Sequence, residues 1–347
     1  MHAKGFPSFL VPVMIIASSG CDNVEFGGFQ LELQAPAPAQ GMPTQIVLPD
    51  SLPTPLAPIQ TGPVLYLVER GEGSEASLVA VASFTDEGYE PLPDSEEVPE
   101  MVERFAIGRF ERATEFVLLS RGARAGTFIA DGFAAADEST CRLRPSASGR
   151  VEIRPEASGE RRFLAVAKDD LFAVGLESAA ESAPLPASPG MAALDPGSVT
   201  AAQIAIPAMN VPWPASIPGA RRDLQPLVFD GGATQGLAAS FVYGGEMDIG
   251  PEVPVAYGLF IASAPVGTRY EPIVAWYQRV GQDGKAFARL LGAHDLQGAG
   301  APDLLLEVFG EEARWLALLG TREGEWSMLY QDPCGVPAAR GGIRTFR

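Results

Sequence analysis

The chain has 347 residues, and Gly and Pro together (38 and 31 residues) make up about a fifth of it. That share is well above average usage, so it argues against long helices and favours many short strands joined by turns. The formal net charge of −18 repels phosphate backbones and therefore disfavours nucleic-acid partners. With only two His residues, His2 and His294, a zinc site built from several histidines is excluded.

The first 20 residues have the pattern of a secretory signal peptide. Lys4 precedes a short apolar run over residues 6–17, and small residues follow at positions 18–20. An apolar run of this length is too short to cross a bilayer, which needs roughly 20 residues. We therefore expect residues 1–20 to direct export of the chain.

The end of this segment, Ser18-Ser19-Gly20-Cys21, resembles the lipobox of bacterial lipoproteins, although that family usually has an aliphatic residue at the place of Ser18. In the family, the cysteine becomes the lipid-modified first residue of the mature protein. The resemblance implies that Cys21 carries acyl chains such as palmitate and anchors the protein in the bacterial cell envelope, facing the periplasm or the cell exterior. Ordinary signal cleavage, which would leave Cys21 as a thiol or a disulfide partner, is the alternative.

Residues 21–62 contain this anchor site and a segment that is dense in Pro. Proline fixes φ and favours the polyproline II conformation over packed secondary structure. We expect a disordered tether that holds the folded part away from the membrane. A generic disordered N-terminus is the alternative.

Strand signals dominate residues 63–175. The expected strands lie at Val64–Val68, Leu78–Phe84, Arg104–Phe110, Glu115–Ser120, Gly126–Ala130, Val151–Ile153 and Phe163–Ala167. Because these short runs recur at regular spacing, we expect a first β domain of sandwich or barrel type, without a long helix.

A second β domain is expected at residues 223–336, where strand-like runs joined by Gly-containing turns predict an antiparallel meander. The expected strands lie at Pro226–Phe229, Leu237–Tyr243, Val255–Ala262, Tyr270–Val280, Ala286–Leu291, Pro302–Phe309, Arg314–Leu319 and Trp326–Tyr330. The Pro-rich residues 176–222 predict an interdomain linker with one helical turn near residues 198–203, or else a surface loop of one large domain. Residues 337–347 predict a flexible tail. The predicted fold is therefore mostly β, with two small antiparallel β domains.

One motif in the second β region suggests metal chemistry. Residues 295–304 read DLQGAGAPDL and resemble the calcium loop of FG-GAP (integrin-type, VCBS) repeats. The resemblance implies that Asp295, Gln297, Ala299 and Asp303 supply the oxygen ligands of a Ca²⁺ ion. Gln297 is a neutral donor and Ala299 offers only its carbonyl, so two carboxylates remain. A hairpin that keeps the turn geometry without an ion is the alternative.

The aromatic residues and the remaining histidine each allow two interpretations. Trp276, Trp315 and Trp326 suggest stacking on carbohydrate, but aromatic side chains on one face of a strand are ordinary core residues, which is what we expect. His294 lies beside Asp295 and suggests acid–base chemistry. Because no nucleophile motif accompanies it, we expect a partly exposed loop histidine.

Two cysteines remain if Cys21 is lipidated. Cys141 and Cys334 lie in different predicted domains, and cysteine pairs in exported proteins are usually oxidised. We expect a disulfide that attaches the end of the second domain to the first. Two buried thiols are the alternative.

The sequence contains no recognisable catalytic constellation, so it leaves enzymatic activity undecided and favours a binding role. The leading hypothesis is a non-enzymatic, lipid-anchored protein that binds or scaffolds an envelope protein or a glycan. The second hypothesis is a periplasmic hydrolase that uses carboxylates, since that chemistry needs no histidine. The third is a calcium-stabilised adhesion module. We expect no cofactor other than the possible Ca²⁺.

Overall fold

The computed structural model describes residues 62–85, 88–92, 99–176, 185–186, 190–229, 234–298, 300–339 and 342–346. Residues 55–347 form one compact unit, which contains all of these segments. The signal peptide, Cys21 and almost all of the tether at residues 21–62 lie outside the described residues.

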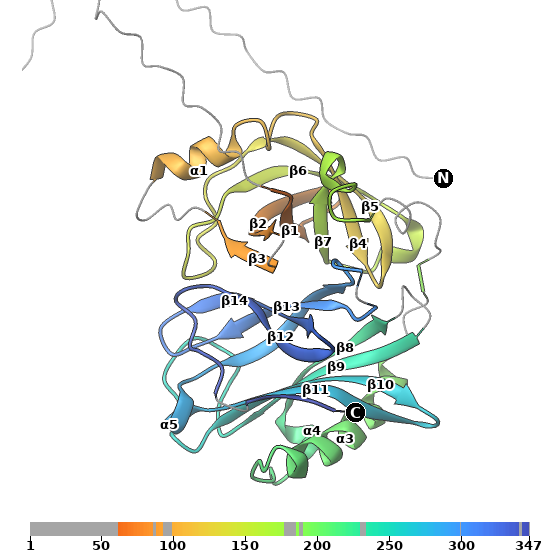
Figure 1. The fold of residues 1–347 in the computed structure, drawn as a ribbon, viewed down its shortest axis with the longest axis vertical. Coiled ribbons are helices and arrows are strands. Elements are labelled where there is room, and N and C mark those ends of the chain that lie inside the picture. The colour runs from red at the N-terminus through yellow and green to blue at the C-terminus, as the bar shows by residue number, and fades with distance from the viewer. Residues whose placement is uncertain are drawn as a thin grey trace, which may run out of the picture. The chain divides into compact units, whose positions relative to one another are not determined.

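The fold is mostly β with antiparallel sheets, which confirms the predicted fold class (Figure 1). The first sheet is closed, because β1 pairs with both β2 and β7, and the order β1-β7-β4-β5-β6-β2 returns to its start. β3 extends this barrel from β2. The strands are β1 (Val64–Arg70), β2 (Glu75–Thr85), β3 (Gly88–Pro91), β4 (Glu115–Ser120), β5 (Ala123–Phe133), β6 (Ser146–Ile153) and β7 (Arg162–Ala167).

Large aromatic side chains fill the barrel. Tyr66, Phe116 and Phe128 are completely buried there, and Tyr66 and Phe128 each meet Phe116 edge to face. Such contacts add to the free energy that burial of the rings already supplies. The interior is therefore a packed core.

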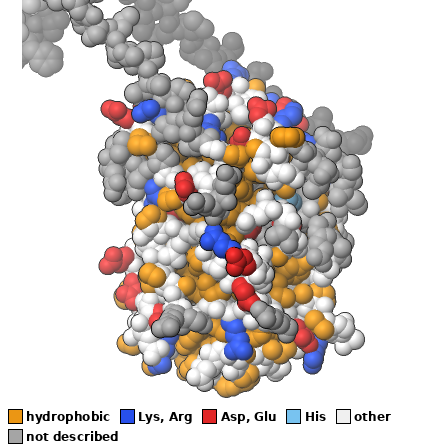
Figure 2. Space-filling view, viewed as in Figure 1, with side chains coloured by type: hydrophobic (Ala, Val, Ile, Leu, Met, Phe, Trp, Pro, Cys, Tyr) orange, Lys and Arg blue, Asp and Glu red, His pale blue; other side chains and the backbone are white. Residues whose placement is uncertain are grey.

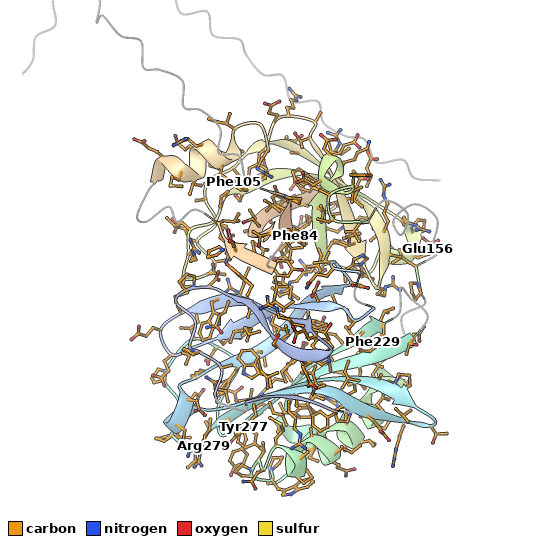
Figure 3. The ribbon with its side chains drawn as sticks, viewed as in Figure 1. Phe84, Phe105, Glu156, Phe229, Tyr277 and Arg279 are labelled. Atoms are coloured by element: carbon orange, nitrogen blue, oxygen red, sulfur yellow. A yellow bond between two sulfur atoms is a disulfide. The ribbon has the colours of Figure 1, made fainter. Side chains whose placement is uncertain are left out.

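Helix α1 (Pro99–Ala106) corrects the strand predicted at Arg104–Phe110. Val102, Phe105 and Ala106 are buried, and their spacing of three and four residues places them on one face of a helix. Phe105 and Ala106 belong to the apolar cluster of the barrel, and Figure 3 shows Phe105 in that part of the molecule. The strand prediction assumes the period of a strand, whereas the buried positions follow the period of a helix.

Two further sheets follow in the chain. One has five strands in the order β16-β11-β10-β9-β8, and the other has four in the order β12-β13-β14-β15. Their bounds are β8 (Arg221–Phe229), β9 (Thr234–Tyr243), β10 (Tyr257–Val266), β11 (Arg269–Arg279), β12 (Phe287–His294), β13 (Asp303–Phe309), β14 (Arg314–Arg322), β15 (Glu325–Gln331) and β16 (Ile343–Thr345). β16 lies in the predicted tail and pairs with β11.

The inner faces of these two sheets form a sandwich around one apolar cluster. Trp276, Trp315 and Trp326 are buried in it, which confirms that they are core residues. Phe229 at the end of β8 belongs to the same cluster (Figure 3).

Helix α3 (Met191–Ala208) covers the other face of the five-stranded sheet and corrects the linker prediction, which allowed only one helical turn. Its apolar side packs on β9, β10 and β11 through Leu194, Ala201 and Ala205. Gly197 permits this approach, because a Cβ atom there would lie 2.3 Å from Cδ2 of Tyr270. The short helices α4 (Ile217–Ala220) and α5 (Val280–Asp283) and the 3₁₀ turns η1 (Pro155–Ala157) and η2 (Lys168–Asp170) complete the described elements.

The barrel rests on the outer face of the four-stranded sheet. Leucine and valine side chains from β1, β2, β4 and β7 join others from β12, β13 and β14 in one buried cluster. Gly292 lies at this contact, where a Cβ atom would be 2.9 Å from Cγ of Leu164. The order of layers is therefore α3, five-stranded sheet, four-stranded sheet and barrel (Figure 1).

One covalent bond and one ion pair cross the same junction. Cys141 and Cys334 form the predicted disulfide, across a sequence separation of 193 residues. Nearby, the buried Arg144 forms an ion pair with the buried Asp332. Both links tie the connection before β6 to the segment after β15.

Candidate binding cleft between barrel and sandwich

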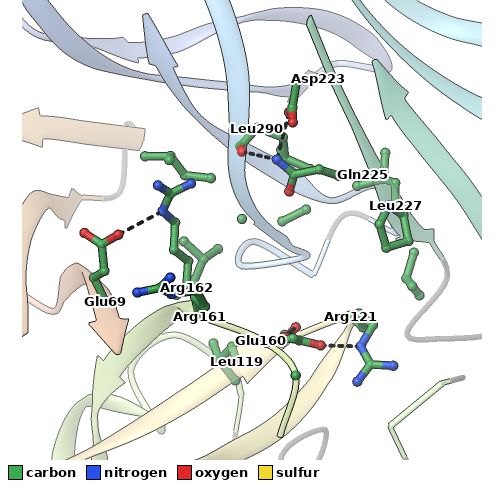
Figure 4. Close-up of a pocket in the computed structure, with 18 of the residues that line it drawn as sticks. Glu69, Leu119, Arg121, Glu160, Arg161, Arg162, Asp223, Gln225, Leu227 and Leu290 are labelled. Carbon is green, nitrogen blue, oxygen red and sulfur yellow. Dashed lines mark hydrogen bonds and ion pairs between the residues drawn. The ribbon is translucent and has the colours of Figure 1, made fainter. Parts of the chain in front are cut away.

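A cleft of about 760 Å³ lies beside this junction (Figure 4). One wall is β8, a second is β12, and the third comes from the barrel at the β4–β5 turn and at the start of β7. Its volume falls in the range of ordinary ligand sites, roughly 300–1,000 Å³. The cleft is therefore the main candidate for a binding site in the described part of the chain.

The cleft meets the edges of β8 and β12. Residues 225–228 of β8 and residues 290–293 of β12 all line it. Side chains of consecutive strand residues point to opposite faces of a sheet, so a surface that touches every residue in a row must run along the strand edge. β8 and β12 are also the terminal strands of their sheets.

One side chain connects the two edges. Gln225 Nε2 donates to the carbonyl oxygen of Leu290 at 2.8 Å and to Oδ2 of Asp223 at 2.8 Å. Burial raises the pKa of the Asp223 carboxyl group, although Gln225 and the charges of Arg289 and Arg162 oppose this shift. Asp223 and Gln225 thus present a partly buried polar pair on the sandwich side of the cleft.

Arginine and glutamate side chains line the barrel side. Arg121 Nε is 2.6 Å from Glu160 Oε1, and Arg162 Nε is 3.4 Å from Glu69 Oε1. Arg161 is exposed at the cleft, and no described residue forms an ion pair or hydrogen bond with its guanidinium group. The barrel side therefore offers one uncompensated positive charge.

A second cavity of about 140 Å³ continues past Val228, which lines both spaces. His294 borders this cavity and is only 4 % exposed, which corrects the expectation of a partly exposed loop residue. Burial lowers the pKa of His294 to about 4, so the ring is neutral at pH 7. Its Nδ1 atom has no hydrogen-bond partner among the described residues.

The loop at residues 295–303 borders the second cavity through Asp295. Oδ2 of Asp295 accepts a hydrogen bond from the Gly300 backbone N–H at 2.8 Å. Oδ1 of Asp303 accepts from Gln297 Nε2 at 2.9 Å, and Oδ2 accepts from the Tyr89 hydroxyl at 2.9 Å. The fourth predicted ligand, Ala299, lies outside the described residues.

Hydrogen bonds close this loop in the structure. Gln297 directs its amide donor, not its oxygen, at Asp303, and Tyr89 from the barrel takes the other carboxylate oxygen. The described residues contain no group of three or more His, Cys, Asp or Glu side chains in metal-binding proximity. Asp303 therefore makes a buried, hydrogen-bonded contact between the barrel and the sandwich.

The chemistry of the larger cleft suits recognition. Of the four acidic residues in its described lining, Glu69, Glu160 and Asp223 are engaged by arginine or glutamine side chains, and Glu156 lies 3.8 Å from Arg154. None of the described residues that line the 760 Å³ space is aromatic, so this lining offers no platform on which a sugar ring could stack. Charged side chains of both signs are interspersed on the face shown in Figure 2.

Sequence reasoning did not identify Asp223, Gln225 or Arg161 as site residues. The only available signal was the polar start of a strand, in the run RRDLQPLVF of β8. Their common site depends on the position of the barrel, which no local pattern reports.

No family model, no curated protein and no solved structure matches this chain. Among the described residues, no helix has the length and apolar character needed to cross a membrane.

Proposed function

We propose that this protein is an exported component of the bacterial cell envelope, anchored through a lipid on Cys21, with a non-enzymatic binding or scaffolding role. The signal-like N-terminus and the small-small-Cys sequence support export and anchoring. The Cys141–Cys334 disulfide is consistent with an oxidising compartment.

The observation that carries the binding role is the 760 Å³ cleft between barrel and sandwich. Its carboxylates are held by neighbouring side chains, which favours a recognition surface over a carboxylate-dependent hydrolase. The partner we expect is an envelope protein, because the described lining of the cleft offers charged and hydrogen-bonding groups and no aromatic platform for a glycan.

The anchoring is tested with the variant Cys21→Ser in the native cell. Metabolic labelling with a fatty-acid probe should be lost, and the protein should move from the membrane fraction to the soluble fraction. Unchanged labelling and unchanged fractionation of the variant would refute the lipid anchor.

The binding role is tested by placing a photo-crosslinking amino acid at Gln225 in the cleft. We expect a discrete adduct with an envelope protein in the native cell. The matched control places the same amino acid at the exposed Arg112, which lines neither cavity. Adducts that are identical from both positions, or absent from both, would contradict a binding role for the cleft.

A further inference from the structure

We infer that the cleft binds an extended segment of a partner polypeptide, which adds as a β-strand to the free edges of β8 and β12 and places an acidic side chain against Arg161. This inference rests on the proposed binding role and specifies its chemistry. It names a peptide, and not a sugar or a nucleotide, as the ligand.

The first argument is the hydrogen-bonding capacity of the two edges. Each residue of an antiparallel strand that points its N–H and C=O groups away from its partner strand needs another acceptor and donor. β8 pairs only with β9, and β12 pairs only with β13, in the described part of the chain. Because residues 225–228 and 290–293 line the cleft, the outward backbone groups of these two segments face it.

The backbone carbonyl group of Leu290 is one such outward group, and it already has a hydrogen-bond partner across the cleft. Its carbonyl oxygen points across the cleft and accepts from Gln225 of β8. A side-chain amide thus makes the kind of bond that a neighbouring strand would make. An inserted peptide can replace this contact with backbone hydrogen bonds, which is the mechanism of strand addition.

The second argument is that the free edges of β8 and β12 are protected against uncontrolled strand pairing. Exposed edge strands invite uncontrolled pairing, and proteins limit this with Pro and charged side chains. Pro226 removes one N–H from the cleft edge of β8, and the barrel shelters β12 from the opposite side. The remaining edge lines the cleft, so pairing there is restricted to a segment that fits the cleft.

The third argument is charge. Arg161 directly precedes β7 and Arg162 begins it at the barrel wall; among the described residues only Arg162 has a carboxylate partner, Glu69. A guanidinium group prefers a carboxylate that it can contact through two N–H groups. A peptide with Asp or Glu facing the barrel wall would neutralise Arg161.

The two edges that line the groove are long enough to pair with a short strand. Residues 225–228 and 290–293 line it on the two edges, and four residues span about 13 Å in an extended chain. Beyond Val228 the groove continues into the second cavity, which His294 borders.

The test is a selection of random peptides of about nine residues, which extend for roughly 30 Å as a strand, displayed on phage against the purified protein. We expect enriched peptides that alternate apolar and polar residues and contain an acidic residue. Arg161→Glu should weaken their binding by at least about tenfold, as expected for a lost charge-assisted contact. The control Arg112→Glu makes the same charge change at an exposed position outside the cleft and should leave binding unchanged.

Two further measurements separate strand addition from side-chain binding. N-methylation of alternate amides in a selected peptide should abolish binding, because it removes the donors that pair with an edge strand. Hydrogen–deuterium exchange should slow in residues 223–229 and 287–294 when the unmodified peptide binds. Binding that survives N-methylation, protection elsewhere, or an absence of Arg161-dependent peptides would overturn the inference.

Failure of this inference is distinguishable from failure of the proposed function. A cleft-specific crosslink at Gln225 with no Arg161-dependent peptide would retain the binding role and reject strand addition. Conversely, peptide binding in the cleft together with unchanged fractionation of Cys21→Ser would retain the site and reject the lipid anchor.

Discussion

The buried ion pair between Arg144 and Asp332 predicts that loss of one partner destabilises the fold strongly. The two side chains are 3 % and 0 % exposed. Asp332 Oδ1 contacts Arg144 and accepts from the Tyr330 hydroxyl at 2.5 Å, while Oδ2 accepts from the Leu316 backbone N–H at 2.8 Å. Burial alone would lower the pKa of Arg144, but the charge of Asp332 raises it above its usual value.

Asp332→Ala leaves three donors without their acceptor in a dry environment. Arg144 keeps hydrogen bonds to the carbonyl groups of Ala80 and Val81, at 3.0 and 2.6 Å, but loses its counter-charge. Breaking a buried pair in this way costs about 3–5 kcal/mol of unfolding free energy. The double variant Arg144→Met/Asp332→Leu should cost less than the sum of the single variants, with a coupling of about 2 kcal/mol or more.

Urea unfolding followed by tryptophan fluorescence measures these free energies, with the Cys141–Cys334 disulfide kept oxidised. The matched control is Glu115→Ala, which removes an exposed ion pair with Lys168 and should cost less than about 1 kcal/mol. A cost for Asp332→Ala no larger than that of the control would refute the argument. So would strictly additive effects of the Arg144 and Asp332 substitutions.

Three other predictions concern the same fold. Replacing Cys141 and Cys334 by Ser should lower the free energy of unfolding by up to about 5 kcal/mol, because the bond closes a loop of 193 residues; an unchanged urea midpoint would contradict this. Burial raises the pKa of Asp303 to about 6, so its carboxyl group is most favourable to folding below about pH 4, and stability should fall by about 3 kcal/mol as pH rises to about 7. The difference in unfolding free energy between the protein and Asp303→Asn should change by that amount between pH 4 and pH 7, and a constant difference would exclude the shift. Gly197→Ala, which normally favours a helix, should instead lower the melting temperature, because its Cβ would lie 2.3 Å from Tyr270.

The fold class, most strands and the disulfide could be predicted because each has a local signal. Alternating or continuous apolar runs bounded by Gly mark strands such as β4 and β14. The tryptophans of the sandwich were predictable as core residues for the same reason, since they lie within strands. The cysteine pair followed from the signals for export.

The two main helices could not be predicted, and the physical causes differ. In α1, a short apolar run fits either period, and only its contact with the barrel selects the helix. In α3, Pro196 and Pro207 lie inside the helix and argue against it locally. Packing of Leu194, Ala201 and Ala205 on the five-stranded sheet outweighs that cost.

The prediction of an exposed His294 is wrong because the residues that surround its side chain lie far from it in the sequence. Its position beside a Gly-rich turn suggests exposure, yet the side chain is buried at the edge of the second cavity, whose other wall is formed by residues 174–176 and Gly122. The same non-local origin applies to Asp303, which meets Tyr89 across 214 residues of sequence. Both residues acquire shifted pKa values because the barrel excludes water from them.

The cleft also arises from contacts between parts of the chain that are distant in the sequence, because it forms where the barrel packs beside the sandwich. This packing explains why the cleft coincides with unpaired strand edges. A barrel has no free edges once β1 pairs with β2, but a two-sheet sandwich keeps four, of which β8 and β12 end on the same side. The barrel packs on the outer face of the four-stranded sheet and extends past β12, so the β4–β5 turn and the start of β7 overhang both edges. Packing of the closed barrel on the open sandwich therefore turns an aggregation-prone strand edge into one wall of a groove. The charged side chains of the groove give it a charge pattern of its own. A larger residue at Gly292, which lines the groove and whose Cβ would lie 2.9 Å from Cγ of Leu164 in the barrel, should therefore move the barrel on this sheet and alter the groove.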